Sequence, residues 1–175
     1  IGYGLYVVTS RDGDKDNGLI VNTVTQVTNT PNRIAVTINK ENYSHHVIKK
    51  TGVMNVNCLD VSAPFFVFQH FGFQSGRDVD KFKEMNLTPL KADIVSAPLI
   101  AESPVNLECK VTEVKELGTH DMFLAEVVAV HVDDAYMDEK NKFHLEYAKP
   151  IVYSHGTYLK TGEEIGTFGY SVRKK

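Results

Sequence analysis

Two long segments with alternating apolar and polar residues lie close together in the sequence, at 105–117 and 122–134. An alternation with a period of two is typical of a β-strand that buries one face. The residues between the segments, Gly-Thr-His-Asp, are frequent turn formers. The two segments therefore predict one long antiparallel β-hairpin.

Shorter strands are predicted on both sides of this hairpin. They lie at 4–10, 19–28, 33–38 and 53–59, with residues 94–101 extended and 149–170 forming short strands and turns. The chain thus has roughly six to eight strands and only two or three short helices. Many short antiparallel strands favour a closed, mainly β barrel, because closure removes exposed strand edges.

The predicted helices are short. One covers residues 43–50, with Asn42 as its N-cap and Gly52 in the position after its end. A second, apolar helix covers residues 63–71 and is expected to be capped by Ser62. Both are therefore expected as additions to a β framework.

The composition fits one globular domain, expected to span residues 1–175. The net charge of −3 and the scattered lysines and arginines give no sign of a nucleic-acid partner. No apolar run approaches the roughly 20 residues that a membrane-spanning helix needs. Cys58 and Cys109 are expected to be free thiols, as is usual in the reducing cytoplasm, and no CxxC pair occurs. A cytoplasmic protein without a membrane or nucleic-acid partner is therefore predicted.

Hydrogen-bond donors and cations gather where the first predicted helix begins, in the stretch NKENYSHHVIKKTG at 39–52. Free backbone N–H groups and the helix dipole make a helix start a potential anion site. Lys40 adds a charge, Ser44 a hydroxyl and His45 a ring nitrogen at the same place. Phosphate is the commonest biological anion held this way, while a solvated cap with surface polar residues stays open as the alternative.

Three weaker features accompany this stretch. Asn22, Thr25 or Thr23, and Thr28 lie in a row along one predicted strand. This row either presents polar groups to a flat heterocycle or simply reflects β propensity. His120 is expected at the hairpin apex and His155 in a later turn, and either could be an ordinary surface residue. The histidine spacing does not predict a metal site, and GxSxG, P-loop and GxGxxG motifs are absent.

Three stretches combine these features: NGLIVNTVTQVTNTPNRIAVTINKENYSHHVIKKTG at 17–52, FGFQSGRDVDKF at 71–82 and GTHDMFLAEVVAV at 118–130. Together they resemble the flavin reductase-like family, whose domain is the FMN-binding split barrel. The similarity extends over nearly the whole chain and looks closest to flavoredoxins and to the flavin domain of high-molecular-weight rubredoxins. It implies an antiparallel, Greek-key-like split barrel with a few short helices and bound FMN.

The resemblance also implies roles for individual residues. The residues implied for the flavin ring are Asn22, Thr23, Val24, Thr25 and Gln26; those for the phosphate end are Asn39, Lys40, Tyr43, Ser44 and His45; those of a loop near the flavin are Ser75, Gly76 and Arg77. His120 matches the histidine of the family's Gly-Asp-His motif beside the nicotinamide, although Thr119 takes the middle position here. The resemblance further implies that His155 forms a second polar wall of this site.

The function implied is that of an NAD(P)H-dependent, flavin reductase-like oxidoreductase. Electrons would pass from NADH or NADPH through FMN to a flavin, metal or protein acceptor, with no covalent protein catalyst. One alternative is a flavoredoxin-type electron-transfer protein with little direct activity towards NAD(P)H, and another is a flavin-binding sensor. Family members are typically homodimers with FMN at the interface. Because the chain lacks CxxC, a redox partner such as rubredoxin would be a separate protein.

Overall fold

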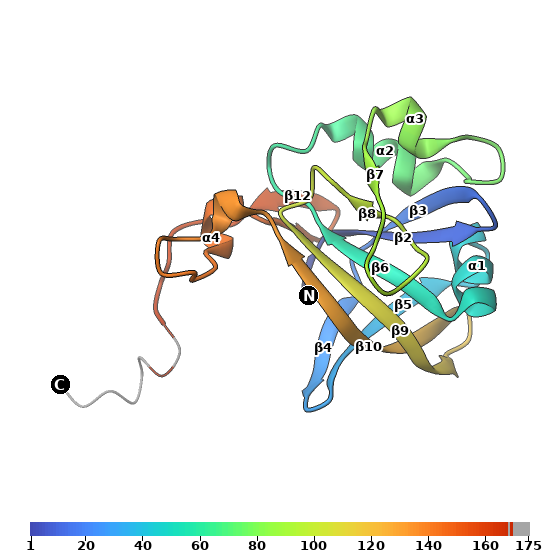
Figure 1. Ribbon diagram of the computed structural model, residues 1–175, viewed down its shortest axis with the longest axis horizontal. Helices are drawn as coiled ribbons and strands as arrows, with labels where there is room; N and C mark the ends of the chain where they lie inside the picture. Colours follow the sequence, from blue (N-terminus) through green and yellow to red (C-terminus); the bar gives the residue numbers. More distant parts are fainter. Residues whose placement is uncertain (168, 170–175) are drawn as a thin grey trace.

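A seven-stranded antiparallel sheet forms the centre of the structure, a computed structural model that describes residues 1–167 and 169 (Figure 1). The strand order across this sheet is β3-β2-β6-β9-β10-β5-β4. Its strands are β2 (Tyr6–Asp12), β3 (Lys15–Val21), β4 (Val24–Asn29), β5 (Asn32–Asn39), β6 (Val53–Cys58), β9 (Val105–Glu116) and β10 (His120–Val132). The prediction of a mainly β, antiparallel fold is confirmed.

The two edge strands of this sheet, β3 and β4, follow each other in the chain and are separated only by Asn22 and Thr23. The Thr23 hydroxyl donates to the Thr37 carbonyl at 2.7 Å, and the Thr37 N–H donates to the Thr23 carbonyl at 3.1 Å. Since β3 also contacts β5, the sheet curls back on itself as a barrel. The single strand predicted over 19–28 is wrong, because the chain passes from one sheet edge to the other at 22–23.

The long hairpin predicted from the alternating pattern is formed by β9 and β10, with two irregularities in its register. The connecting turn comprises residues 117–119. His120 therefore lies at the first position of β10, paired with Asn39 of β5. The apex position expected for His120 is wrong, because pairing with β5 continues up to this residue.

Apolar side chains fill the interior of the barrel. The side chains without any exposed surface include Val8, Val36, Met54, Val56, Cys109, Phe123 and Ala125. Cys109 and the half-buried Cys58 are both free thiols, and burial raises their pKa values to about 12 and about 11. Because protein interiors are close-packed, a nucleotide-sized ligand has to bind outside this core.

Three helices pack on the outside of the sheet: α1 (Tyr43–Thr51), α2 (Phe65–Phe73) and α3 (Lys81–Met85) (Figure 1). α1 contacts β2, β3 and β6, and α2 and α3 contact β3 and each other. α1 ends as predicted, with Gly52 in the left-handed conformation at φ 71°. α2 begins later than predicted, because Ser62 donates both its N–H and its hydroxyl to Asp60 and does not cap a helix. None of the helices formed by the described residues is long and apolar enough to cross a membrane.

The remaining elements lie around the barrel. They are β1 (Gly2–Gly4), β11 (Ile151–Ser154) and β12 (Thr157–Lys160) in a three-stranded sheet, the pair β7 (Pro89–Leu90) and β8 (Leu99–Ile100), the 3-10 turn η1 (Asp134–Tyr136) and α4 (Leu145–Ala148). Of the residues expected to be extended at 94–101, only β8 is a strand. The preceding residues bend because the Glu108 carboxylate accepts three consecutive backbone N–H groups, from Asp93, Ile94 and Val95, at 2.7–2.9 Å.

Candidate functional site

A polar hollow of about 160 Å³ lies between the beginning of α1 and the loop that follows α2. Four residues expected to bind the cofactor line it: Tyr43 and Ser44 from α1, and Ser75 and Gly76 from the loop. The other lining residues are Leu19, Glu41, Asn42, Phe71, Gly72, Phe73, Gln74 and Lys81. The structure thus brings together two groups of predicted residues that lie far apart in the sequence.

Ser44 is held in the hollow by a contact to β3. Its side chain is almost completely buried, and its Oγ accepts a hydrogen bond from Nδ2 of Asn17 at 2.8 Å. Oδ1 of Asn17 is buried and accepts no hydrogen bond from the described residues. A Cβ added to Gly76 would collide with the Asn17 side chain, so the loop backbone packs tightly against it. Asn17 therefore connects β3, α1 and the loop, and it leaves one acceptor unused.

Lys81 supplies the positive charge of the polar hollow. Its side chain is only 3% exposed, and its Nζ donates to the carbonyls of Gly18 at 2.7 Å and Phe71 at 3.3 Å. No carboxylate among the described residues pairs with it. Burial lowers its pKa to about 8, so the amine is mostly protonated at neutral pH. Sequence reasoning missed Lys81, because nothing in its spacing separates it from the solvent-exposed lysines of other short helices.

An aromatic hollow of about 200 Å³ adjoins the polar one. Its lining residues are Leu5, Ile20, Asn22, Phe68, Gly72, Phe73, Tyr153 and Tyr158. Gly72 and Phe73 line both hollows, so the two are neighbours, and we call them together the groove, with an aromatic end and a polar end. Asn22 is the residue expected here from the sequence. The two tyrosines were missed, because only the packing of the small β1-β11-β12 sheet brings them to this place.

Lys40 and His45, both expected at the phosphate, do not line the polar hollow. They contact Asp121, which is fully buried in β10: His45 Nε2 lies 2.9 Å from Oδ2, and Lys40 Nζ lies 3.3 Å from Oδ1. Lys49 Nζ also lies 3.1 Å from Oδ2. Burial alone would raise the pKa of Asp121, but the hydrogen bonds from His45, Lys49 and Lys40 lower it to about 2. These three side chains are therefore engaged with an internal carboxylate.

The side chains expected along the flavin ring have different surroundings in the structure. Val24 packs against the barrel core, and Thr25 is exposed. Nε2 of Gln26 donates to Oδ1 of Asn29 at 3.0 Å and to Oδ1 of Asn32 at 3.1 Å, in the turn between the strands. Of this group, only Asn22 lines the groove.

The remaining expected residues flank the groove or lie elsewhere on the surface. Arg77 lies over the ring of Tyr43, with its guanidinium carbon 5.3 Å from the ring centroid. The side chain of Asn39 accepts the Glu41 N–H at 2.9 Å. His120 is half-buried, with Nδ1 2.9 Å from the Thr119 hydroxyl. His155 is exposed in the turn between β11 and β12, at φ 49°.

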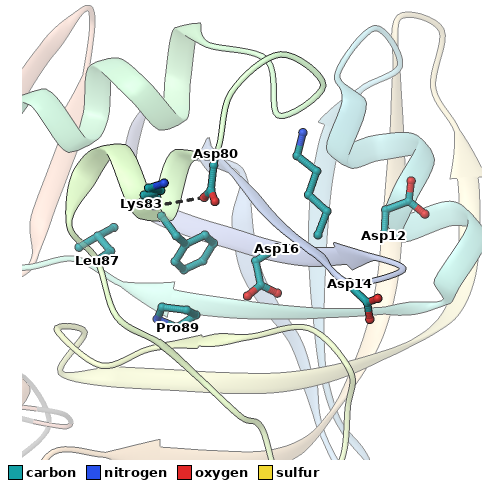
Figure 2. Close-up of a pocket in the computed structure, with 9 residues that line it drawn as sticks. Asp12, Asp14, Asp16, Asp80, Lys83, Leu87 and Pro89 are labelled. Atoms are coloured by element: carbon teal, nitrogen blue, oxygen red, sulfur yellow. Dashed lines mark hydrogen bonds between the residues drawn. The ribbon is translucent and has the colours of Figure 1, made fainter.

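A larger hollow of about 640 Å³ lies beside the β2–β3 turn and α3. Figure 2 shows Asp12, Asp14, Asp16 and Asp80 around it. Asp12 accepts hydrogen bonds from Tyr43 at 2.8 Å and from Lys50 at 3.0 Å, and Asp16 accepts one from Arg11 at 2.6 Å. The concentration of carboxylates makes this hollow unsuitable for a phosphate.

One group of possible metal ligands occurs among the described residues, formed by Asp93, Glu108 and His131. The fully buried Glu108 carboxylate already accepts the three backbone N–H groups of the 93–95 segment and a hydrogen bond with His131 Nε2 at 2.7 Å. Both carboxylate oxygens are thus used in holding the segment against β9. This cluster has a structural role.

Comparison with known proteins identifies the family of this chain. The sequence matches the profile of the flavin reductase like domain over residues 1–162. A ferric-chelate reductase (NAD(P)H) of Archaeoglobus fulgidus is 35% identical over 147 residues, which cover 83% of this chain and 85% of that protein. A high molecular weight rubredoxin of Moorella thermoacetica is 32% identical over 161 residues, which cover 91% of this chain but only 64% of that protein.

The fold is shared with a solved flavoredoxin. The structure of the flavoredoxin of Desulfovibrio vulgaris (Miyazaki F) matches with a TM-score of 0.90 at 23% identity, over 98% of this chain and 93% of that one. The predicted split barrel is thereby confirmed. With a family profile that covers most of its length and a relative at 35% identity, the chain belongs to the flavin reductase-like family.

Proposed function

We propose that this protein binds FMN in the groove and passes electrons from NADH or NADPH through it to a flavin, metal or protein acceptor. The observation that carries the proposal is that an aromatic and a polar hollow adjoin at Gly72 and Phe73. FMN has the same division, with a flat aromatic ring at one end and a phosphate at the other. The two hollows together reach the lower end of the roughly 300–1,000 Å³ usual for ligand sites.

The polar hollow fits a phosphate in both charge and donors. It lies at the N-terminus of α1, where the first backbone N–H groups and the helix dipole favour an anion. The hydroxyl of Ser44 and the amine of Lys81 line the same space, and hydrogen bonds from charged donors to phosphate are roughly twice as strong as neutral ones. Glu41 opposes this charge, but it is exposed to solvent.

The aromatic hollow fits the flavin ring. Tyr153 and Tyr158 lie with their ring centroids 5.3 Å apart and tilted by 56°, and such walls favour stacked or edge-on packing of another flat ring. Asn22 adds an amide that can donate to and accept from the polar edge of a heterocycle. Ring and phosphate would therefore be bound by different residues.

FMN supplies the redox chemistry when it is bound, and the protein contributes binding and orientation. None of the groove residues has to act as a covalent catalyst. We place His120 and His155 on the side of the donor or acceptor, as the family resemblance implies. We further propose that residues 1–175 act as one FMN-binding domain in the cytoplasm, as a homodimer with FMN at the interface. Light scattering should then give twice the chain mass of 19.6 kDa.

An electron-transfer protein with little activity towards NAD(P)H is the second candidate. The fold shared with a flavoredoxin and the relative named as a high molecular weight rubredoxin favour it, and we propose a separate redox protein such as rubredoxin as its partner. The relative named as a ferric-chelate reductase (NAD(P)H) favours the reductase. The choice between the two depends on the electron donor.

The test is to load the protein with FMN, remove oxygen and follow the visible spectrum after adding NADH or NADPH. We expect the bound flavin to be bleached within seconds to minutes by at least one of the two. Flavin that stays oxidised with both donors, but is reduced by a reduced rubredoxin, would reject the reductase and support the electron carrier. A chain that binds no FMN would contradict both candidates.

A further inference from the structure

Phe73 exposes an aromatic ring at the junction of the two hollows. It is the last residue of α2, and 82% of its surface is accessible. The other α2 phenylalanines that pack into the core behave differently: Phe68 is 6% exposed and Phe71 is 1% exposed. Because Phe73 lines both hollows, a ligand that occupies the whole groove has to pass it.

The backbone around Phe73 is well fixed. The N–H of Gln74 donates to the His70 carbonyl at 3.1 Å and closes the last turn of α2. The carbonyl of Phe71 accepts from Lys81 at 3.3 Å, and Gly72 lies beside β3, where an added Cβ would be in ordinary van der Waals contact with Ile20 at 3.9 Å. The exposed ring therefore projects from an ordered helix end, at a position set by the same residues that form the groove.

We infer that Phe73 is a binding residue for the ring system of the cofactor, onto which it packs at the junction of the hollows. This inference rests on the proposed function, since it needs a flat aromatic ligand in the groove. A phenylalanine ring in water gains free energy when another ring covers it, through burial of apolar surface and aromatic packing. This contribution depends on the ring alone, so FMN and riboflavin, which lacks the phosphate, should depend on Phe73 equally.

The test compares dissociation constants for FMN and riboflavin, measured from the flavin fluorescence, in the wild-type protein and in Phe73→Ala. We expect the substitution to weaken both ligands by at least tenfold, which corresponds to about 1.4 kcal/mol. Phe66→Ala is the matched control, because Phe66 lies on the same helix, is 49% exposed and lines a different hollow. The affinities of Phe66→Ala for FMN and riboflavin should stay within twofold of those of the wild type. Phe73→Tyr should retain most of the wild-type affinity for both ligands.

Several outcomes would overturn the inference. Equal affinities in the wild type and Phe73→Ala would show that the ring does not contact the cofactor. A loss for FMN without a loss for riboflavin would mean that Phe73 acts through the phosphate end. Unchanged affinities together with dissociation into monomers would assign Phe73 to a contact between two copies of the chain. A wild-type protein that binds neither flavin would overturn the proposed function together with this inference, so the two failures are distinguishable.

Discussion

At the scale of single residues, Lys81 gives the polar hollow its preference for an anion. Folding brings this amine out of water and leaves it with two carbonyl partners, at 2.7 Å and 3.3 Å. Carbonyl dipoles stabilise the charge only in part, which is why burial lowers the pKa. A phosphate beside it would complete the set of partners. Ser44 would contribute a neutral donor to the same group.

Replacing Ser44 with alanine should weaken FMN binding by about tenfold to a hundredfold, because a hydrogen bond to a charged group contributes about 1.5–3 kcal/mol. Riboflavin has no phosphate, so its affinity should not change. Fluorescence titration of both ligands gives the comparison, with Ser96→Ala in an exposed loop as control. Equal losses for both ligands would place Ser44 at the ring, against our assignment.

Binding of FMN should weaken as the pH rises through about 8, the pKa of Lys81, because the amine loses the charge that attracts the phosphate. In Lys81→Met this pH dependence should vanish, and the affinity at pH 7 should fall at least tenfold. Lys83→Met, an exposed lysine of the same helix, should behave as the wild type. FMN affinity that is flat between pH 7 and pH 9.5 in the wild type would contradict a role for Lys81.

Only some of the contacts made by single residues could be predicted from the sequence. Ser44 could be predicted, because it follows an N-cap residue at the start of a helix, where anions bind. The partners of Lys40 and His45 could not, because they depend on Asp121, which β10 brings to α1 only in the folded barrel. The sequence places both residues beside a helix start, but it does not show that a buried carboxylate from another element contacts them there.

At the scale of elements, Asp121 joins α1 to the β9–β10 hairpin. The carboxylate lies within 3.3 Å of side-chain nitrogens from His45, Lys40 and Lys49. These contacts fix the beginning of α1 relative to the barrel. They thereby also set the positions of Tyr43 and Ser44, which lie in the first turn of that helix. The hairpin and α1 were predicted well because alternation and caps are local signals. The start of α2 was not, because the bond between Ser62 and Asp60 competes with capping.

Asp121→Asn should lower the melting temperature at pH 7 by more than about 5 °C, because the fully buried side chain loses the charge that holds the nitrogens of His45, Lys40 and Lys49. The folded-state pKa of about 2 lies below the ordinary value of 3.8. The stabilisation is therefore present above about pH 4 and is lost as the pH falls towards 2. Melting temperatures measured by circular dichroism at several pH values should differ less and less between Asp121→Asn and the wild type as the pH falls through that window. The control Asp78→Asn, which replaces an exposed carboxylate, should melt as the wild type. A difference that stays constant down to pH 2 would exclude this linkage.

At the scale of the whole molecule, the groove exists because distant parts of the chain meet outside a filled barrel. β3 and α1 form one wall, the end of α2 with its loop forms another, and the small C-terminal sheet contributes Tyr153 and Tyr158. The barrel itself could be predicted from alternation and turn residues. The aromatic end of the groove could not be predicted. It depends on the packing of β11 and β12 against α2, and no sequence pattern in these elements indicates that they contact one another.

The most direct test of the central claim is the crystal structure of the protein with FMN. We expect the phosphate beside Ser44 and Lys81 and the ring in the aromatic hollow between Asn22, Phe73 and Tyr153. FMN bound elsewhere, for example along the exposed face of β4 or in the acidic hollow of Figure 2, would contradict it. So would an FMN whose phosphate contacts Lys40 and His45 in place of Asp121.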